Sequence, residues 1–286
     1  MTYAKLAGLE ERFADVKGVR MRYFLGGSGP PLILVHGLGG AASNWGELVP
    51  ALAERHRLLV PDLPGHGGST ALPAVSGLEP FADRVGLVAE REGVFPAPVV
   101  GHSLGGVIVL RLALRRPADV QALVLAGSAG LSIGNVYMRQ LLTAATSIRP
   151  GRLAARYRRW VRRSGLLRRL VFGFVSVADP VGMTDDAIEG FLAAQLLHTD
   201  VDSAWHALRV DDPRQELEAV RCPVLVLWGS EDVQLPLQDA FEYTRRLHAR
   251  LRVIPGCGHL LIGERPDACF DAIEGFLGDR SRASIR

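Results

Sequence analysis

The sequence predicts an α/β fold: a mostly parallel central sheet with helices on both faces and a helical cap insertion. The first observation is that short apolar runs, such as residues 31–35, alternate with stretches of helical pattern. Continuous apolar runs of this length are typical of strands buried on both faces of a parallel sheet. The second observation is that the alternation stops after residue 130 and resumes at residue 213. We therefore expect one sheet domain with an insertion.

Length and composition fit a single large core. The chain has 286 residues, of which 48% are hydrophobic and 22% are charged, as is ordinary for a globular protein. An α/β chain of this length often stays one domain. We assign residues 1–130 and 213–286 to the core and residues 131–212 to a helical lid or cap.

Before the insertion, strands and helices are expected to follow one another as in a parallel sheet. A cap at Ser43 or Asn44 is expected to begin one helix, and Pro117 to stop another. The expected strands are residues 11–16, 19–25, 31–35, 56–60, 97–100 and 120–126, and the expected helices run from 43 or 44 to 54, from 79 to 92 and from 107 to 116.

After the insertion, two more strands and two helices are expected to complete the sheet domain. The insertion itself shows helical patterns without strands. The tail, residues 278–286, is expected to fray. The expected strands are residues 223–228 and 251–254, and the expected helices are residues 237–248 and 266–277.

Charge, cysteines and apolar runs limit the possible classes of protein. The formal net charge of +3 is too small to indicate a polyanionic partner. Cys222, Cys257 and Cys269 are scattered and odd in number, which favours a reducing compartment over a disulfide framework. No signal-peptide pattern, apolar run of membrane-spanning length or metal-ligand spacing occurs. These features predict a cytoplasmic protein with no transmembrane segment, no metal and no cofactor.

A candidate nucleophile lies between the strand expected at 97–100 and the helix expected at 107–116. Gly101, Ser103 and Gly105 fit the pattern Gly-x-Ser-x-Gly. A sharp turn from strand to helix holds a serine out of the sheet, and its glycines avoid collisions with the neighbouring strand and helix. The pattern predicts that Ser103 is a nucleophile.

A serine needs a base, and the base needs an orienting acid. In parallel sheets, ligands bind beyond the carboxyl ends of the strands, so acids and histidines that directly follow strands are candidates. Asp232 and Glu231 follow one expected strand, and His259 follows the next. Ser103, His259 and one of the two carboxylates form a complete set for nucleophilic catalysis.

These motifs resemble those of the α/β-hydrolase fold superfamily over about residues 11–278. In this chain the serine comes first, the acid second and the histidine last, in the order Ser103, Asp232, His259. A serine at position 103, in place of Asp, argues against the family members that use a carboxylate nucleophile. The matching pieces are HGLGG at 36–40, DLPGHGGS at 62–69, GHSLGG at 101–106, WGSED at 228–232 and GCGH at 256–259.

The resemblance also implies a role for each residue of the site. It makes Ser103 the nucleophile, His259 the general base and Asp232 the acid, because the family's acid closes a Gly-x-x-Asp turn and Glu231 does not. The backbone N–H groups of Leu38 and Leu104 are implied as the oxyanion hole.

The implied function is hydrolysis of a small-molecule carboxylic ester through an acyl-enzyme intermediate. The same machinery would suit a lactone, an acyl thioester or carrier-bound ester, or a carbon–carbon bond. The family members that cleave carbon–carbon bonds usually carry Gly-Pro-Gly after the first His-Gly, and this chain has Gly-Leu-Gly-Gly at residues 37–40. The difference makes hydrolysis of a carbon–carbon bond the less favoured reaction. A ligand-binding protein with vestigial hydrolysis is the alternative from another class.

The insertion carries a strongly cationic segment, Arg149 to Arg169, with nine arginines. No acidic residue occurs from residue 136 to residue 178. Leu153, Tyr157 and Trp160, followed by Val161 and Leu167, recur at helical spacing. We expect a solvated lid helix whose apolar face covers the site. An acidic acyl carrier, a CoA thioester or an anionic membrane surface are the alternative partners, and no motif for nucleic acid accompanies the charge.

Overall fold

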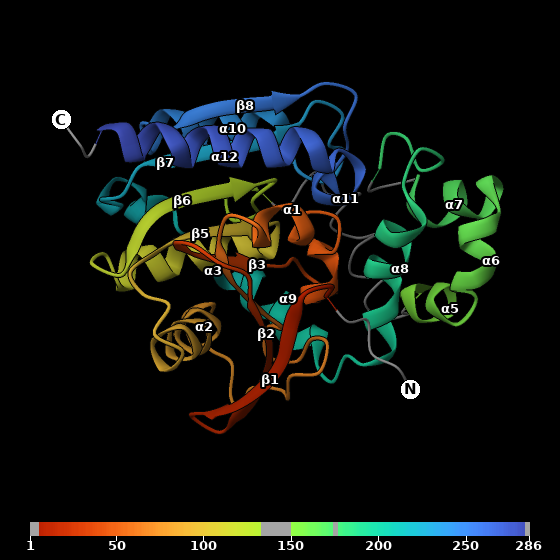
Figure 1. Cartoon of the computed structure of the whole chain (residues 1–286), viewed down its shortest axis with the longest axis horizontal. Coiled ribbons are helices and arrows are strands. Elements are labelled where there is room, and N and C mark those ends of the chain that lie inside the picture. Colours follow the sequence, from red (N-terminus) through yellow and green to blue (C-terminus); the bar gives the residue numbers. More distant parts are fainter. Residues whose placement is uncertain (1–5, 133–149, 174–176, 284–286) are drawn as a thin grey trace.

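A computed structural model shows an eight-stranded sheet with helices on both faces and a helical cover at one end (Figure 1). It describes residues 6–132, 150–173 and 177–283. The predicted fold class is confirmed. The strands are β1 (Leu9–Val16), β2 (Val19–Gly26), β3 (Pro31–Val35), β4 (Arg57–Pro61), β5 (Ala97–His102), β6 (Val120–Ala126), β7 (Val224–Gly229) and β8 (Arg250–Ile254).

The sheet order is β1-β2-β4-β3-β5-β6-β7-β8. The first two strands form an antiparallel hairpin, and β2 also pairs antiparallel with β4. All the later pairings are parallel. The carboxyl ends of β5, β7 and β8 therefore lie at the same edge of the sheet, where ligands bind in open parallel sheets.

Helices cover both faces because the central strands are apolar on both sides. In β3, Ile33 and Val35 pack into one core cluster, whereas Leu32 and Leu34 pack into the other, as the two-residue period of a strand requires. The first cluster includes side chains of α2 (Glu79–Arg91), α3 (Leu104–Arg115) and α10 (Leu237–Arg246). The second includes side chains of α1 (Val49–Ala53), α11 (Leu261–Glu264) and α12 (Pro266–Ala283).

Between β6 and β7 the described residues form helices only. Figure 1 shows α5–α8 beyond the end of the sheet toward which the β6 and β8 arrows point. The boundaries 131 and 212 for the lid remain a prediction. The elements are α5 (Pro150–Arg156), α6 (Arg158–Arg163), α7 (Gly165–Phe172), α8 (Asp185–Ala193), η2 (Ala194–Leu196), α9 (Val201–Val210) and η3 (Arg214–Ala219).

Three details differ from the sequence prediction. The helix expected to begin at Ser43 or Asn44 is a short 3-10 turn, η1 (Ala42–Trp45), followed by the five-residue α1. Helix α12 continues to Ala283, six residues past its expected end. The arginine-rich segment is not one helix: Tyr157 and Ser164 leave helical geometry and divide it into α5, α6 and α7.

No helix in the described ranges is both long and apolar enough to cross a membrane.

Candidate active site

Ser103 lies in a strained turn between β5 and α3. Its φ of 55° and ψ of −119° are rare for a residue with a side chain and cost about 1–3 kcal/mol. The two glycines of the motif are needed in this turn because a side chain at either position would collide with neighbouring backbone atoms. A Cβ on Gly101 would lie 2.3 Å from the carbonyl oxygen of Gly105, and a Cβ on Gly105 would lie 2.3 Å from that of Val35. The backbone thus holds the serine hydroxyl beyond the strand end.

The structure brings Ser103, His259 and Asp232 together. The Ser103 Oγ lies 3.0 Å from Nε2 of His259, and Nδ1 of His259 lies 2.8 Å from Oδ2 of Asp232. Because the ionised carboxylate only accepts, Nδ1 carries the proton. Nε2 is then free to accept the serine proton. This is the relation between a nucleophile, a base and an orienting acid.

Backbone N–H groups hold the carboxylate of Asp232 through the oxygen that does not face His259. Its side chain is 1% exposed, and Oδ1 accepts hydrogen bonds of 2.9 Å from the backbone N–H groups of Gln234 and Leu235. By contrast, Glu231 is exposed, and its backbone N–H donates to the carbonyl oxygen of Cys257. The geometry therefore distinguishes the two carboxylates that sequence spacing left open.

Leu38, one of the two residues that the resemblance implies as an oxyanion hole, lines the same cavity as Ser103, and Leu104 directly follows the serine in the chain. The loop that carries Leu38 approaches so closely that a Cβ on Gly37 would lie 2.9 Å from the Cβ of Ser103. Within the described ranges, no group accepts a hydrogen bond from the backbone N–H of Leu38 or of Leu104. Both donors remain available beside the serine.

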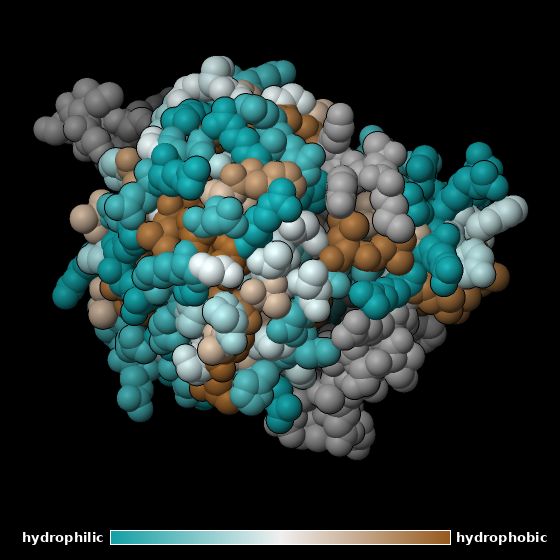
Figure 2. All heavy atoms as spheres, turned by 90° about the horizontal axis from the view of Figure 1, so that it is seen from below, coloured by the Kyte–Doolittle hydropathy of each residue, from teal (hydrophilic) through white to brown (hydrophobic). Residues whose placement is uncertain are grey.

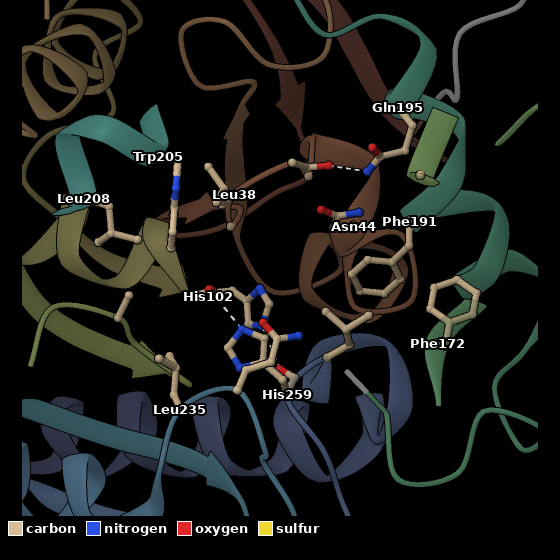
Figure 3. A pocket seen from close by; sticks show the side chains of 18 of the residues that line it. Leu38, Asn44, His102, Phe172, Phe191, Gln195, Trp205, Leu208, Leu235 and His259 are labelled. Carbon is tan, nitrogen blue, oxygen red and sulfur yellow. Dashed lines mark hydrogen bonds between the residues drawn. The ribbon is translucent and has the colours of Figure 1, made fainter. Parts of the chain in front are cut away.

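Two side chains from the helical cover hold this loop. Gln195 Nε2 donates to the carbonyl oxygen of Gly39, a contact drawn in Figure 3, and His198 Nε2 donates to the same oxygen over 2.9 Å. His198 Nδ1 accepts from the backbone N–H of Gly67, which fixes the neutral tautomer. Sequence analysis missed both residues because nothing local marks a contact spanning more than 150 positions.

The loop that carries His259 is held by two buried groups. Nε2 of His102 donates to the backbone carbonyl of His259 over 2.9 Å. The carboxylate of Glu264 accepts from the N–H of Gly258 and from the N–H groups of Ala178 and Asp179 in the cover. Sequence reasoning missed these contacts as well, since His102 occupies a variable position of the serine motif and Glu264 belongs to no motif.

Burial keeps three neighbouring histidines neutral. It lowers the pKa of His102 to about 3 and that of His66 to about 4. It also lowers the pKa of His36 well below its usual value, and that ring bridges the carbonyl oxygen of Gly37 and the N–H of Leu63. Burial also raises the pKa of the Cys257 thiol, so this residue stays uncharged beside the histidine loop.

A cavity of about 310 Å³ opens over Ser103, at the lower end of the size range of small-molecule sites. None of its described lining residues is acidic or basic apart from histidine. Polar groups come from Asn44, Ser132, Gln195 and Gln234. Figure 3 shows Trp205 and Leu208 on one side, Phe172 and Phe191 on the other, and His102, His259 and Leu235 at the base.

The described residues contain no group of three or more His, Cys, Asp or Glu side chains that could hold a metal ion.

Comparison with known proteins shows the family to which the chain belongs. The pattern that defines the alpha/beta hydrolase family matches residues 32–272. An acetyltransferase component of the acetoin-cleaving system of Pseudomonas putida is 32% identical, over 92% of this chain and 68% of that protein. The pimeloyl-[acyl-carrier protein] methyl ester esterase of Nitrosomonas europaea is also 32% identical, over 86% and 96%. A solved esterase from a Rhodococcus species shares the fold, with a TM-score of 0.75, 24% identity and coverage of 95% and 98%.

Proposed function

The chain belongs to the alpha/beta hydrolase family, and from this premise we propose that it is a serine hydrolase that cleaves carboxylic esters through an acyl-enzyme intermediate. One observation carries the proposal: the hydrogen-bonded series from Ser103 Oγ to His259 and on to Asp232, at the base of a cavity. A serine hydroxyl alone is a weak nucleophile at neutral pH, and this series supplies both a base and an acid that orients it.

In the acylation step, Ser103 Oγ attacks the carbonyl carbon of the ester as its proton passes to Nε2 of His259. The resulting imidazolium is stabilised by the buried carboxylate of Asp232. When the tetrahedral intermediate collapses, the bond to the alcohol oxygen breaks and Nε2 returns the proton to that oxygen. The acyl group is left on Ser103 and the alcohol departs.

The negative charge that forms on the carbonyl oxygen needs donors held in place beforehand. The N–H groups of Leu38 and Leu104 are the proposed donors. Removing one such donor typically raises the barrier by about 3 kcal/mol. Gln195 and His198 act here as positioning residues, because their bonds to the Gly39 carbonyl fix the orientation of the loop that presents the Leu38 N–H.

Deacylation repeats the cycle with water. His259 takes a proton from a water molecule, the hydroxide adds to the acyl carbon, and the bond to Ser103 Oγ breaks as Nε2 returns the proton to it. The products are the free acid and the regenerated serine. No step requires a metal or an organic cofactor.

The cavity supports an ester with an uncharged acyl group. Its lining is largely apolar and offers no lysine, arginine or carboxylate among the described residues, so a charged acyl group would be desolvated without a partner. The cited esterase relative from Nitrosomonas europaea supports ester cleavage as the reaction class. Lactones, thioesters and carbon–carbon bonds stay as alternatives for the same nucleophile.

The test is a panel of p-nitrophenyl esters of increasing acyl length, with a lactone and an acyl thioester beside them. We expect turnover of neutral esters by the wild type and a loss of roughly 10⁶-fold in kcat for Ser103→Ala. Ser28→Ala, in an exposed loop, is the matched control and should keep full activity. Ester hydrolysis that survives Ser103→Ala would contradict the proposal, and a product burst without turnover would favour the ligand-binding alternative.

A further inference from the structure

Helices α5–α7 expose several large apolar side chains. Among the described residues, large apolar side chains that are mostly exposed are otherwise scattered, but five lie within residues 153–170. This corrects the expectation of one apolar stripe packed over the site. Of that stripe, only Val161 is buried and Leu167 partly buried. The exposed five are Leu153, Tyr157, Trp160, Leu166 and Leu170.

Arginines surround these side chains. Arg152 donates to the backbone carbonyl oxygen of His198, and the others in the described ranges fall into two groups. Arg158, Arg162 and Arg168 form ion pairs with Asp185 or Glu189 and so tie α6 and α7 to α8. A second group has no acidic side chain within salt-bridge distance in the described ranges. Arg149 lies outside those ranges. The second group consists of Arg156, Arg159, Arg163 and Arg169.

Apolar and cationic side chains share the same helices at short spacing. In α7, Leu166 and Leu170 are four residues apart and therefore lie on one face, with Arg169 beside them. Arg159 stacks 5.6 Å from the ring of Trp160. Figure 2 shows hydrophobic and hydrophilic side chains side by side at the end of the molecule that α5–α7 form. We call this set of five apolar side chains and four arginines the outer cover face.

We propose that the outer cover face docks on an anionic phospholipid membrane. A membrane interface suits every member of this set. Leucines enter the acyl boundary, Trp and Tyr rings sit at headgroup level, and arginines pair with lipid phosphates. An acidic carrier protein would satisfy the arginines, but it offers no hydrophobic phase for five protruding apolar side chains. Charge and hydrophobicity together therefore favour the lipid surface.

Helix α7 connects this face with the candidate active site. Leu170 points to solvent, whereas the next two residues, Val171 and Phe172, line the cavity over Ser103. A lipid-borne ester would thus reach the cavity from the side of the same helix. This last consequence rests on the proposed function, but membrane docking itself does not.

Binding is measured by co-sedimentation with vesicles of phosphatidylcholine mixed with phosphatidylglycerol, against vesicles of pure phosphatidylcholine. Trp160 supplies a second readout, because Trp45, Trp205 and Trp228 are buried. We expect binding to the anionic vesicles that weakens with added salt, together with a blue shift of the tryptophan emission. The inactive Ser103→Ala protein should bind vesicles as the wild type does. A failure of membrane docking can therefore be distinguished from a failure of the proposed ester hydrolysis.

Two variants test the face itself. Replacing Arg156, Arg159 and Arg169 by glutamine should weaken binding about a hundredfold, at about fivefold per charge. The matched control replaces the exposed Arg209, Arg221 and Arg252 by glutamine, which gives the same net charge and should bind as the wild type does.

The apolar part is tested by Leu166→Asn with Leu170→Asn, which should lose the emission shift, against Phe241→Asn on α10, which should keep it. The proposal is overturned if the wild type does not bind anionic vesicles, or if both cover variants bind them as well as their controls do. Binding of an acidic acyl carrier protein to this face, with no binding to vesicles, would also overturn it.

Discussion

The sheet edge around Ser103 and the helical cover above it differ in how their side chains are held. At the sheet edge, each candidate catalytic side chain follows the carboxyl end of a strand, and hydrogen bonds with backbone groups hold Asp232 and the loop of His259. In the cover, short helices meet at breaks in helical geometry, and ion pairs on their surface connect them. The comparison teaches that the sheet fold holds the candidate catalytic groups in place, whereas helices of the cover line the cavity above them.

Substitution of the buried carboxylate at the sheet edge is expected to cause the largest loss of activity. It tests whether the position of a carboxylate at this edge decides its role. Asp232→Asn should reduce kcat about 10⁴-fold, because the amide favours the wrong tautomer of His259. Glu231→Gln, one residue away and exposed, should stay within about twofold of the wild type. Steady-state kinetics on the best ester of the panel measures both. Equal losses in the two variants would mean that the acid is misassigned.

The next largest expected effect is a loss of stability when the close backbone packing next to Ser103 is disturbed. A Cβ on Gly105 would meet the carbonyl oxygen of Val35 at 2.3 Å, and backbone cannot step aside. Gly105→Ala should therefore destabilise the protein by about 4 kcal/mol or prevent folding. Gly275→Ala, in α12 with no atom near its Cβ, should stabilise it by about 0.5–1 kcal/mol. Urea unfolding followed by circular dichroism distinguishes the two, and similar stabilities would show that the turn is not tightly packed.

The buried histidines predict how this edge responds to acid. The pKa of His66 is about 4 in the folded protein and about 6.5 when unfolded. Between these values the unfolded chain binds more protons, so stability is complete above about pH 6.5 and falls as the pH drops towards 4. The loss from this one group is about 3 kcal/mol. Unfolding free energies of the wild type and His66→Gln across this range should converge as the pH falls, and parallel curves would contradict the expectation.

The smallest effect concerns a contact between the cover and the loop that carries Leu38. Gln195→Ala removes one of the two donors to the Gly39 carbonyl and should lower kcat about tenfold, with little change in KM. A purely structural role would leave kcat unaltered in protein of normal stability. The matched control is Leu196→Ala, an exposed position in the same 3-10 turn. If both variants behave alike, the cover does not position the oxyanion loop.

The same contrast explains how much could be predicted from the sequence. Strand positions and the order Ser103, Asp232, His259 were readable, because apolar runs and glycine turns are local signals. The contacts of Gln195, His198 and Glu264 were not, because each depends on two segments that only the tertiary fold brings together. Helical spacing also misassigned the stripe of the cover. Periodicity identifies a face, but it does not tell whether the chain stays helical or what that face meets.

The most direct test of the central claim is labelling with a fluorophosphonate, which reacts with an activated serine, followed by mass spectrometry of the peptides. The account predicts one phosphonyl adduct per chain, on the peptide that contains Ser103, and its loss in His259→Ala. An adduct on another residue, or an unlabelled Ser103 in protein that still hydrolyses esters, would contradict it.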